Sequence, residues 1–244
     1  MAEKIKKEKK QKFKKPNPFI WFLLLIVSKI WMFFISKVKC EGNALKKRNK
    51  KEGAIVLFNH QTNQDHFICA QAAGFNRLSF VVSDYYMRKP FTNFILKLAR
   101  AIPKVQFRTD LVSIRKMKRA VDHKGLLTIA PAGQVTLHGE VTYVDPSIVK
   151  LLKLCKVDVY ATQIRGGYIC FPKWRKNRKS RKSKIRVKIV KVLTKEQVAS
   201  MSDQELFDKV FEAISLSEHE LKKIEPIKIK SSIKTFLDSN LFAI

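Results

Sequence analysis

Short apolar runs alternate with helical segments through most of this chain, and that alternation is the strongest constraint on its fold. The runs are compact and bounded by polar residues, which is typical of strands buried on both faces. Such an order predicts an α/β fold with a mostly parallel central sheet flanked by helices. The expected strands are 54–58, 78–83, 102–107, 126–130, 157–164 and 185–193; the expected helices are 64–74, 90–100, 111–123 and 146–155, and two more that open with capping boxes at Thr194 and Ser202.

An apolar segment, residues 19–35, precedes this region. As a helix it would span about 25 Å, less than the roughly 30 Å hydrocarbon core of a bilayer. Its two flanks carry equal positive charge, whereas a spanning helix shows an excess on one side. No small-residue cleavage site follows, which argues against a signal peptide. We therefore expect an N-terminal membrane-associated helix that lies in one leaflet; a buried core helix is the alternative.

The basic residues are unevenly distributed. The 244 residues include 50 Lys and Arg against 20 Asp and Glu, a formal net charge of +30, and the 45% hydrophobic content excludes a disordered polycation. About half of the cations lie in residues 1–15, 37–51 and 173–191. This excess predicts a polyanionic partner, either an anionic membrane or a nucleic acid. Because two clusters bracket the apolar segment, membrane lipids are favoured and nucleic acid is the weaker alternative, based on the basic loop 173–181.

The four cysteines form no CxxC pair and no ligand-like grouping with histidine. This pattern predicts reduced thiols, two or three of them in the core, and no metal site. Together with the apolar segment, it predicts a protein on the cytoplasmic face of the cell membrane, held there as a monotopic or single-helix-anchored protein. The expected organisation is a basic N-terminus with the anchoring helix over residues 1–42, an α/β domain over 43–224 and a C-terminal tail of uncertain structure over 225–244.

The residues that directly follow the strands are the candidates for chemistry, because sites in such sheets lie at the carboxyl ends of the strands. Asn59, His60 and Asp65 follow the first strand. Asp65 can reach back to one ring nitrogen of His60 and leave the other free as a base, although His60 could instead merely cap the next helix. Arg108 follows the third strand beside a helix N-terminus, which suits a phosphate; a surface arginine is the alternative.

A tight turn follows the strand at 126–130. It contains Pro131 and Gly133, and a glycine there lets the backbone approach a ligand closely. A purely structural turn would explain the same residues equally well.

Taken together and in this order, these blocks resemble the glycerolipid acyltransferase family, in particular its 1-acylglycerol-3-phosphate acyltransferases. The family's N-H-x4-D block corresponds to Asn59, His60 and Asp65, and its second block ends in Arg108. The third block, usually F-P-E-G-T-R, reads A-P-A-G-Q-V at 130–135, and the V-P-V-type fourth block reads V-D-V-Y at 157–160. The departures are Ala132 for Glu, Gln134 and Val135 for Thr and Arg, and Asp158 for Pro. The resemblance covers about residues 45–200 and includes the N-terminal anchor.

The resemblance implies transfer of a fatty acyl group from acyl-CoA or acyl-carrier protein to a lysophospholipid hydroxyl, with 1-acylglycerol-3-phosphate as the first-ranked acceptor and phosphatidate as its product. His60 would be the general base and Asp65 its partner. Arg108 would hold the acceptor phosphate, and the N–H groups around Gly133 would face the oxyanion. Asn59 and Pro131 complete the expected substrate-binding set. No cofactor beyond the acyl donor and no metal is implied.

Two alternatives remain at this point. One is an acyltransferase with another acceptor, such as glycerol-3-phosphate or a different lysolipid. The other is a non-catalytic basic protein that binds membranes or nucleic acid.

Overall fold

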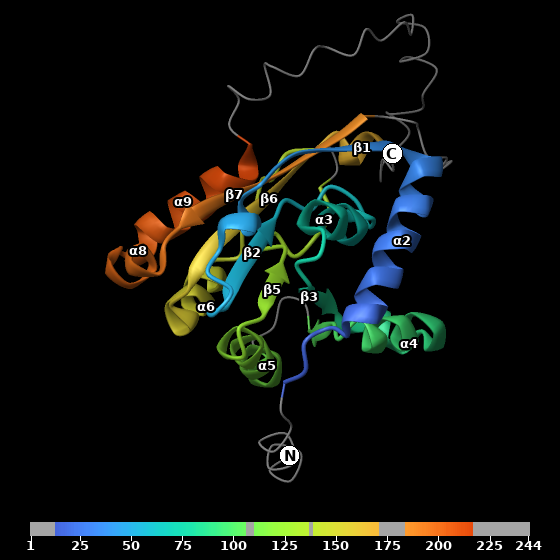
Figure 1. Ribbon diagram of the computed structural model, residues 1–244. Coiled ribbons are helices and arrows are strands. Elements are labelled where there is room, and N and C mark those ends of the chain that lie inside the picture. The colour runs from blue at the N-terminus through green and yellow to red at the C-terminus, as the bar shows by residue number, and fades with distance from the viewer. Residues whose placement is uncertain (1–12, 106–109, 137–138, 171–183, 217–244) are drawn as a thin grey trace, which may run out of the picture.

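The computed structural model describes residues 13–105, 110–136, 139–170 and 184–216. These residues form a seven-stranded sheet in the order β1-β7-β6-β2-β5-β3-β4, with helices on both faces (Figure 1). Within this sheet β6 and β7 pair antiparallel, and every other neighbouring pair is parallel. The predicted mostly parallel α/β sheet is confirmed. The strands are β1 (Lys37–Asn43), β2 (Ala54–Phe58), β3 (Leu78–Ser83), β4 (Ile102–Lys104), β5 (Leu126–Ile129), β6 (Asp158–Arg165) and β7 (Lys184–Leu193).

The helices divide into two groups, one on each face of the sheet. The group with α3 and α2 covers one face, and the group with α5, α6, α8 and α9 covers the other (Figure 1). The helices are α2 (Pro18–Ile35), α3 (Asp65–Ala73), α4 (Pro90–Leu98), α5 (Leu111–Asp122), α6 (Ser147–Cys155), α7 (Gly167–Cys170), α8 (Lys195–Ser200) and α9 (Asp203–Ser215), with 3-10 turns η1 (Ala44–Lys47) and η2 (Asp84–Arg88).

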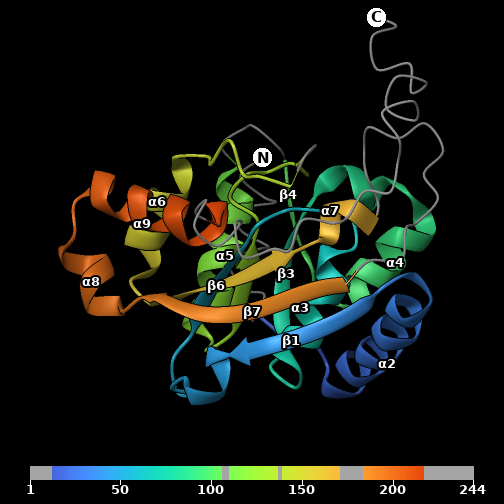
Figure 2. The ribbon, with the colours of Figure 1, turned by 90° about the horizontal axis from the view of Figure 1, so that it is seen from above.

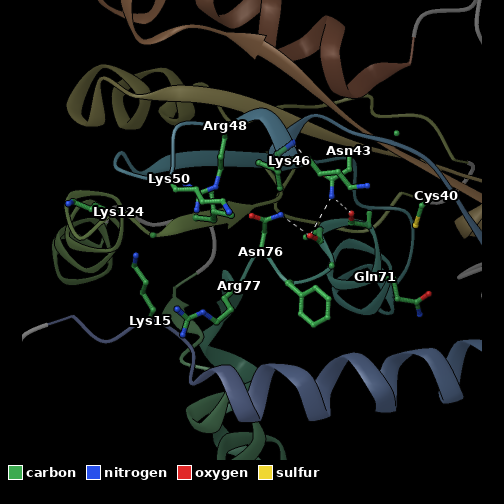
Figure 3. Close-up of a pocket in the computed structure, with 18 of the residues that line it drawn as sticks. Lys15, Cys40, Asn43, Lys46, Arg48, Lys50, Gln71, Asn76, Arg77 and Lys124 are labelled. Carbon is green, nitrogen blue, oxygen red and sulfur yellow. Dashed lines mark hydrogen bonds between the residues drawn. The ribbon is translucent and has the colours of Figure 1, made fainter.

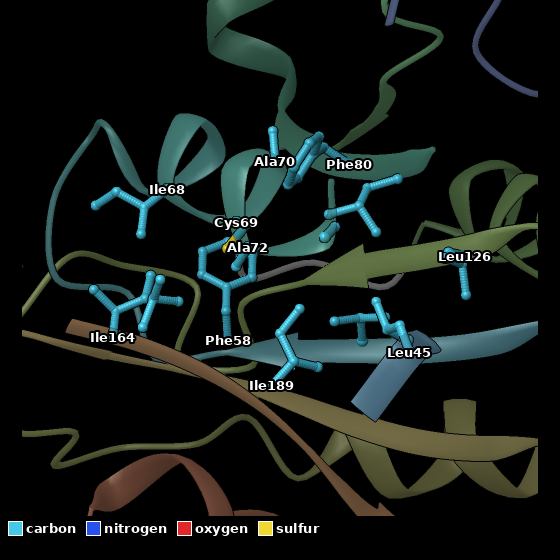
Figure 4. Close-up of a cluster of buried hydrophobic side chains, with 14 of the residues drawn as sticks. Leu45, Phe58, Ile68, Cys69, Ala70, Ala72, Phe80, Leu126, Ile164 and Ile189 are labelled. Atoms are coloured by element: carbon cyan, nitrogen blue, oxygen red, sulfur yellow. The ribbon is translucent and has the colours of Figure 1, made fainter. Parts of the chain in front are cut away.

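Strand β2 lies at the centre of the sheet and contributes side chains to the hydrophobic cores on both of its faces. Its five residues are all buried, and alternate side chains point to opposite faces. Ala54, Val56 and Phe58 join the core under α3, where Phe58 lies close to Cys69 (Figure 4). Ile55 and Leu57 join the core under α5 and α6. This strand therefore fixes the position of whatever follows Phe58.

The expected helix ends agree with the structure where caps define them. Asp110 caps α5 by accepting from the N–H groups of Val112 and Ser113. Both predicted capping boxes form, Thr194 with Gln197 and Ser202 with Glu205. The strand expected over 102–107 forms β4 at Ile102–Lys104, and residues 106–109 lie outside the described part of the chain.

Strand β1 is an element that the sequence did not predict. It lies at the sheet edge beside β7, and most of its residues are exposed. Its sequence, K-V-K-C-E-G-N, contains one aliphatic side chain, Val38, which is half-buried and packs against the core under α3. The domain boundary expected after residue 42 falls within this strand.

Helix α2 packs along one narrow stripe and exposes the rest of its apolar surface. The buried stripe packs mainly against α3, whereas Phe33 is 81% exposed and Phe34 69%. Two hydrogen bonds attach the helix to the domain: the Trp21 indole donates to the carbonyl of Gly74 (2.8 Å), and Gln71 donates to the carbonyl of Ser28 (2.9 Å). By length and composition this helix could cross a membrane. The stripe consists of Trp21, Leu25, Ser28, Met32 and Ile35.

Candidate active site

The loop between β2 and α3 brings His60 and Asp65 together. His60 Nδ1 lies 2.8 Å from Asp65 Oδ2. The same oxygen accepts the backbone N–H groups of Gln61 (2.6 Å) and Thr62 (3.0 Å). Asp65 is fully buried, and the side chain of His60 is 16% exposed. The predicted pair is therefore in hydrogen-bonding geometry at the carboxyl end of the central strand.

The environment of Asp65 fixes the tautomer of His60. Burial raises the pKa of Asp65, while the hydrogen bonds from His60, Thr62 and Gln61 oppose that rise by stabilising the carboxylate. An imidazole that donates its Nδ1–H to this carboxylate carries its lone pair on Nε2. Nε2 forms no hydrogen bond with any residue that the structure describes. The arrangement can thus accept a proton at Nε2 and stabilise the resulting imidazolium.

The side chains of Asn59 and Gln61 anchor this loop through hydrogen bonds to distant parts of the chain. Asn59 is fully buried; its amide donates to the carbonyl of Ile164 and accepts the N–H of the same residue, both at 2.7 Å. Gln61 donates to the carbonyl of Gly139 (3.1 Å) and accepts the N–H of Gly167 (2.8 Å). Both side chains therefore connect the His60 loop to β6 and the segment after it.

The turn after β5 lies against the His60 loop. The N–H of Thr136 donates to the carbonyl of His60 at 2.8 Å. Gly133 has a φ of 66°, and its N–H donates to the carbonyl of Ala130 (3.1 Å). The carbonyl of Pro131 accepts the N–H of Asp145 (3.0 Å). The two blocks that follow β2 and β5 therefore meet at one edge of the sheet, as the sequence predicted, with the Gly133 N–H engaged inside its own turn.

Comparison with known proteins places this geometry in a family. Residues 37–165, which include both blocks, match the family described as Acyltransferase. The chain belongs to the acyltransferase family. The predicted enzyme class is confirmed.

The fold of this acyltransferase resembles a solved structure. It is similar to the crystal structure of the 1-acyl-sn-glycerophosphate (LPA) acyltransferase PlsC from Thermotoga maritima, with a TM-score of 0.70 and 20% sequence identity. The match covers 83% of this chain and 80% of the Thermotoga maritima chain. Among curated proteins, no sequence matches.

Two positions where the acyltransferase departs from its family blocks have structural roles here. Ala132, which stands for the usual Glu, is buried in the core beneath α5 and α6 together with Val141 and Val144. Asp158, which stands for the usual Pro, begins β6 and pairs with Lys191 at 2.7 Å. Arg108, the basic loop 173–181 and the tail 225–244 lie outside the described residues.

One titratable residue of the site escaped the sequence analysis. His66 follows Asp65, and its ring centre lies 6.4 Å from that of His60 and 4.9 Å from that of Phe80. Burial, together with the charge of His60, lowers the pKa of His66 to about 4, so this ring is neutral at physiological pH. Apart from its place next to the motif, nothing in the sequence distinguishes it.

The cysteines are free thiols, as expected. Cys69, Cys155 and Cys170 are buried and Cys40 is exposed. Burial raises the pKa of Cys69 well above its usual value, which keeps this thiol close to the site protonated. Within the described ranges, no three His, Cys, Asp or Glu side chains gather as metal ligands would.

Proposed function

We propose that this acyltransferase transfers a fatty acyl group from acyl-CoA or acyl-carrier protein to the hydroxyl of a lysophospholipid, with 1-acylglycerol-3-phosphate as the first candidate. The observation that carries the proposal is the hydrogen-bonded His60–Asp65 pair at the carboxyl end of a parallel sheet, in a chain that belongs to the acyltransferase family. The acceptor is suggested by the similar fold of the Thermotoga maritima enzyme, which is a 1-acyl-sn-glycerophosphate acyltransferase.

In the proposed mechanism His60 acts on the acceptor directly. Its Nε2 removes the hydroxyl proton as the oxygen attacks the thioester carbonyl carbon. The tetrahedral intermediate then expels the thiolate, which takes the proton back from the imidazolium. Asp65 keeps the ring in the reactive tautomer and stabilises its charge. Because the hydroxyl attacks the acyl donor itself, these steps need no acyl-enzyme and no group other than the acyl donor.

The remaining proposed roles concern substrate binding. Arg108 would bind the acceptor phosphate with its guanidinium group. Because the Gly133 N–H is engaged with Ala130, the N–H groups of the residues after it are the better candidates for the oxyanion. Asn59 and Pro131 would serve the site by shaping the two loops, since Asn59 is fully buried and the Pro131 carbonyl anchors Asp145.

The exposed apolar faces of α2 and α4 support membrane association. Helix α4 lies near the N-terminal end of α2 (Figure 1), and Figure 2 shows both helices at the same side of the molecule. On α4, Phe91 is 78% exposed and Phe94 60%, and on α2 the phenylalanines near its C-terminal end are similarly exposed. Because one stripe of α2 packs on α3, we propose that the helix lies in one leaflet beside the domain, on the cytoplasmic face, rather than crossing the bilayer.

The decisive test is acyl transfer by the His60→Ala variant. We expect its activity with radiolabelled acyl-CoA and lysophosphatidate to fall by about 10²–10⁴-fold, with an unchanged melting temperature. His123→Ala is the matched control, because His123 is exposed at the end of α5. Normal transfer by His60→Ala would refute the assignment. Running the same assay with other lysolipids, glycerol-3-phosphate and acyl-carrier-protein donors identifies the substrates.

A further inference from the structure

A second hollow lies at the end of the sheet away from His60. Its volume is about 840 Å³, and its wall includes the residues directly before β3 and at the start of β5 (Figure 3). The last residues of α3 also line it, whereas the first residue of α3 is Asp65. Nine helical residues span roughly 13 Å, so the two sites lie at opposite ends of the same helix.

The wall of this cavity is strongly cationic. Among the described residues, six basic side chains from four separate segments line it, together with a single acid, Glu41. Glu41 forms an ion pair with Arg186 (3.7 Å), outside the cavity lining. Within the described part of the chain, none of the six cations forms an ion pair. They are Lys15, Lys46, Arg48, Lys50, Arg77 and Lys124.

Capping of α3 does not account for these cations. A helix C-terminus attracts positive charge, and the carbonyls of Ala72 and Ala73 lie beside the cavity. Those carbonyls, however, accept from neutral amides: Asn43 donates to Ala72 (2.7 Å) and Asn76 to Ala73 (3.0 Å) (Figure 3). The basic groups are therefore left for another partner.

The two guanidinium groups are held in place by backbone oxygens. Arg48 donates to the carbonyl of Glu52 (3.2 Å), and Arg77 donates to the carbonyl of Pro16 (2.8 Å). Arg48 Nε is buried with no hydrogen-bond partner among the described residues. Such fixed guanidinium groups are pre-organised for an oxyanion.

The cluster carries an electrostatic cost. Burial, and then the like charges of Arg77, Arg48 and Lys124, lower the pKa of Lys15. The protein alone therefore disfavours the charged form of this lysine. An anion in the cavity would reverse that effect.

We propose that this cavity binds a phosphate group, at a site separate from the His60–Asp65 pair. Arginine forks and lysine ammonium groups are the side chains that proteins use for phosphate. The phosphate could belong to a lipid headgroup or to a soluble phosphate ester.

The position of the cavity favours a lipid headgroup. Lys15 and Arg77 lie near the N-terminal end of α2, and Arg48 and Lys50 lie on the opposite wall (Figure 3). The indole of Trp21 bonds α2 to Gly74 in the cavity wall, and Phe75 in that wall is 84% exposed. A headgroup bound here would lie beside the N-terminal end of α2, the helix that carries the exposed apolar residues.

The test compares two triple variants of the full chain in neutral detergent. Lys46→Gln/Lys50→Gln/Lys124→Gln removes three exposed cavity lysines, and Lys150→Gln/Lys156→Gln/Lys209→Gln removes three exposed lysines elsewhere. The sets match in charge, and each includes one lysine with positive φ (Lys124 and Lys156).

The first measurement is calorimetric binding of inorganic pyrophosphate. We expect the cavity variant to bind about 100-fold more weakly than the unaltered chain, and the control variant to bind as well as it does, because each basic group near an anion contributes about fivefold. Equal losses in the two variants, or no binding by the unaltered chain, would overturn the proposal. His60→Ala should bind pyrophosphate normally, so this result is independent of whether the chain transfers acyl groups to lysophosphatidate.

The second measurement distinguishes the two sources of phosphate. It uses vesicles of phosphatidylcholine with and without phosphatidylglycerol. A lipid-headgroup site predicts that only the cavity variant loses its preference for phosphatidylglycerol. A site for soluble phosphate esters predicts equal vesicle binding by both variants, with pyrophosphate binding lost in the cavity variant alone. Either result supports a phosphate site.

Discussion

The two ends of helix α3 differ in how their charges are satisfied. At the first end, the buried carboxylate of Asp65 accepts hydrogen bonds from His60, Gln61 and Thr62. At the other end, six cations surround a cavity and form no ion pair with a described residue. The first arrangement is complete within the chain and suits proton transfer, which needs fixed groups. The second is completed only by a partner, which suits recognition.

The largest expected effect comes from a substitution that alters only the first end of α3. Asp65→Asn keeps the side chain's size but removes the carboxylate that fixes the His60 tautomer. We expect acyl transfer to fall by about 10³–10⁴-fold, by analogy with the effect of such a change in serine-protease triads. Pyrophosphate binding at the far end of α3 should not change. Asp122→Asn, which removes a surface partner of Lys118, is the control and should keep its activity.

An intermediate effect concerns pH and tests the burial of His66. Its pKa is about 4 in the folded chain against 6.5 for the free side chain, so the unfolded chain binds a proton that the folded chain does not. This contribution to stability is full above pH 6.5 and is lost as the pH falls toward 4. Between pH 7 and 4.5, the unaltered chain should lose about 2 kcal/mol more unfolding free energy than His66→Phe, as measured by urea denaturation.

The control for this comparison is His123→Phe, which replaces an exposed histidine. It should lose stability with acid just as the unaltered chain does. If the unfolding free energies of the unaltered chain and His66→Phe fell equally with pH, the pKa of His66 would not be lowered by folding, and the prediction would be wrong.

The smallest expected effect tests the repulsion among the cations at the second end of α3. Lys124→Gln removes one of the like charges that act on Lys15. We expect a gain of about 0.3 kcal/mol in unfolding free energy at 20 mM NaCl, which disappears at 500 mM because salt screens the repulsion. Lys156→Gln shares the exposure and the positive φ but lies outside the cavity, and it should give no salt-dependent gain. A salt-independent gain in Lys124→Gln would point to a cause other than charge.

The sequence predicted most of the fold because buried strands and helix caps are local signals. The run at 54–58 is apolar throughout since β2 is buried on both faces, and the capping boxes that begin at Thr194 and Ser202 span only four residues each. Strand β1 escaped prediction because Val38 is its one aliphatic residue, which is too little for an apolar pattern. The single buried stripe of α2 escaped as well, because the helix is apolar on nearly every side and only packing selects one of them.

The contact between His60 and Asp65 was predictable for the same reason, and the rest of its surroundings was not. His60 and Asp65 lie five residues apart on one strand-to-helix turn, so their contact is local. The partners of Gln61 are Gly139 and Gly167, which are distant in sequence. The cationic cavity combines members of two lysine-rich clusters with the isolated Arg77 and Lys124. Because these segments are far apart in the sequence, no local pattern predicts that they meet.

The attachment of α2 has a consequence for where the chemistry can take place. Hydrogen bonds of Trp21 and Gln71 join this helix to α3 and the turn after it, and only Ser36 separates α2 from β1 in the chain. Any surface that binds the exposed face of α2 therefore stands at a set distance and tilt from His60. Under the role proposed for His60, this position sets the depth below that surface at which an acceptor hydroxyl can be reached.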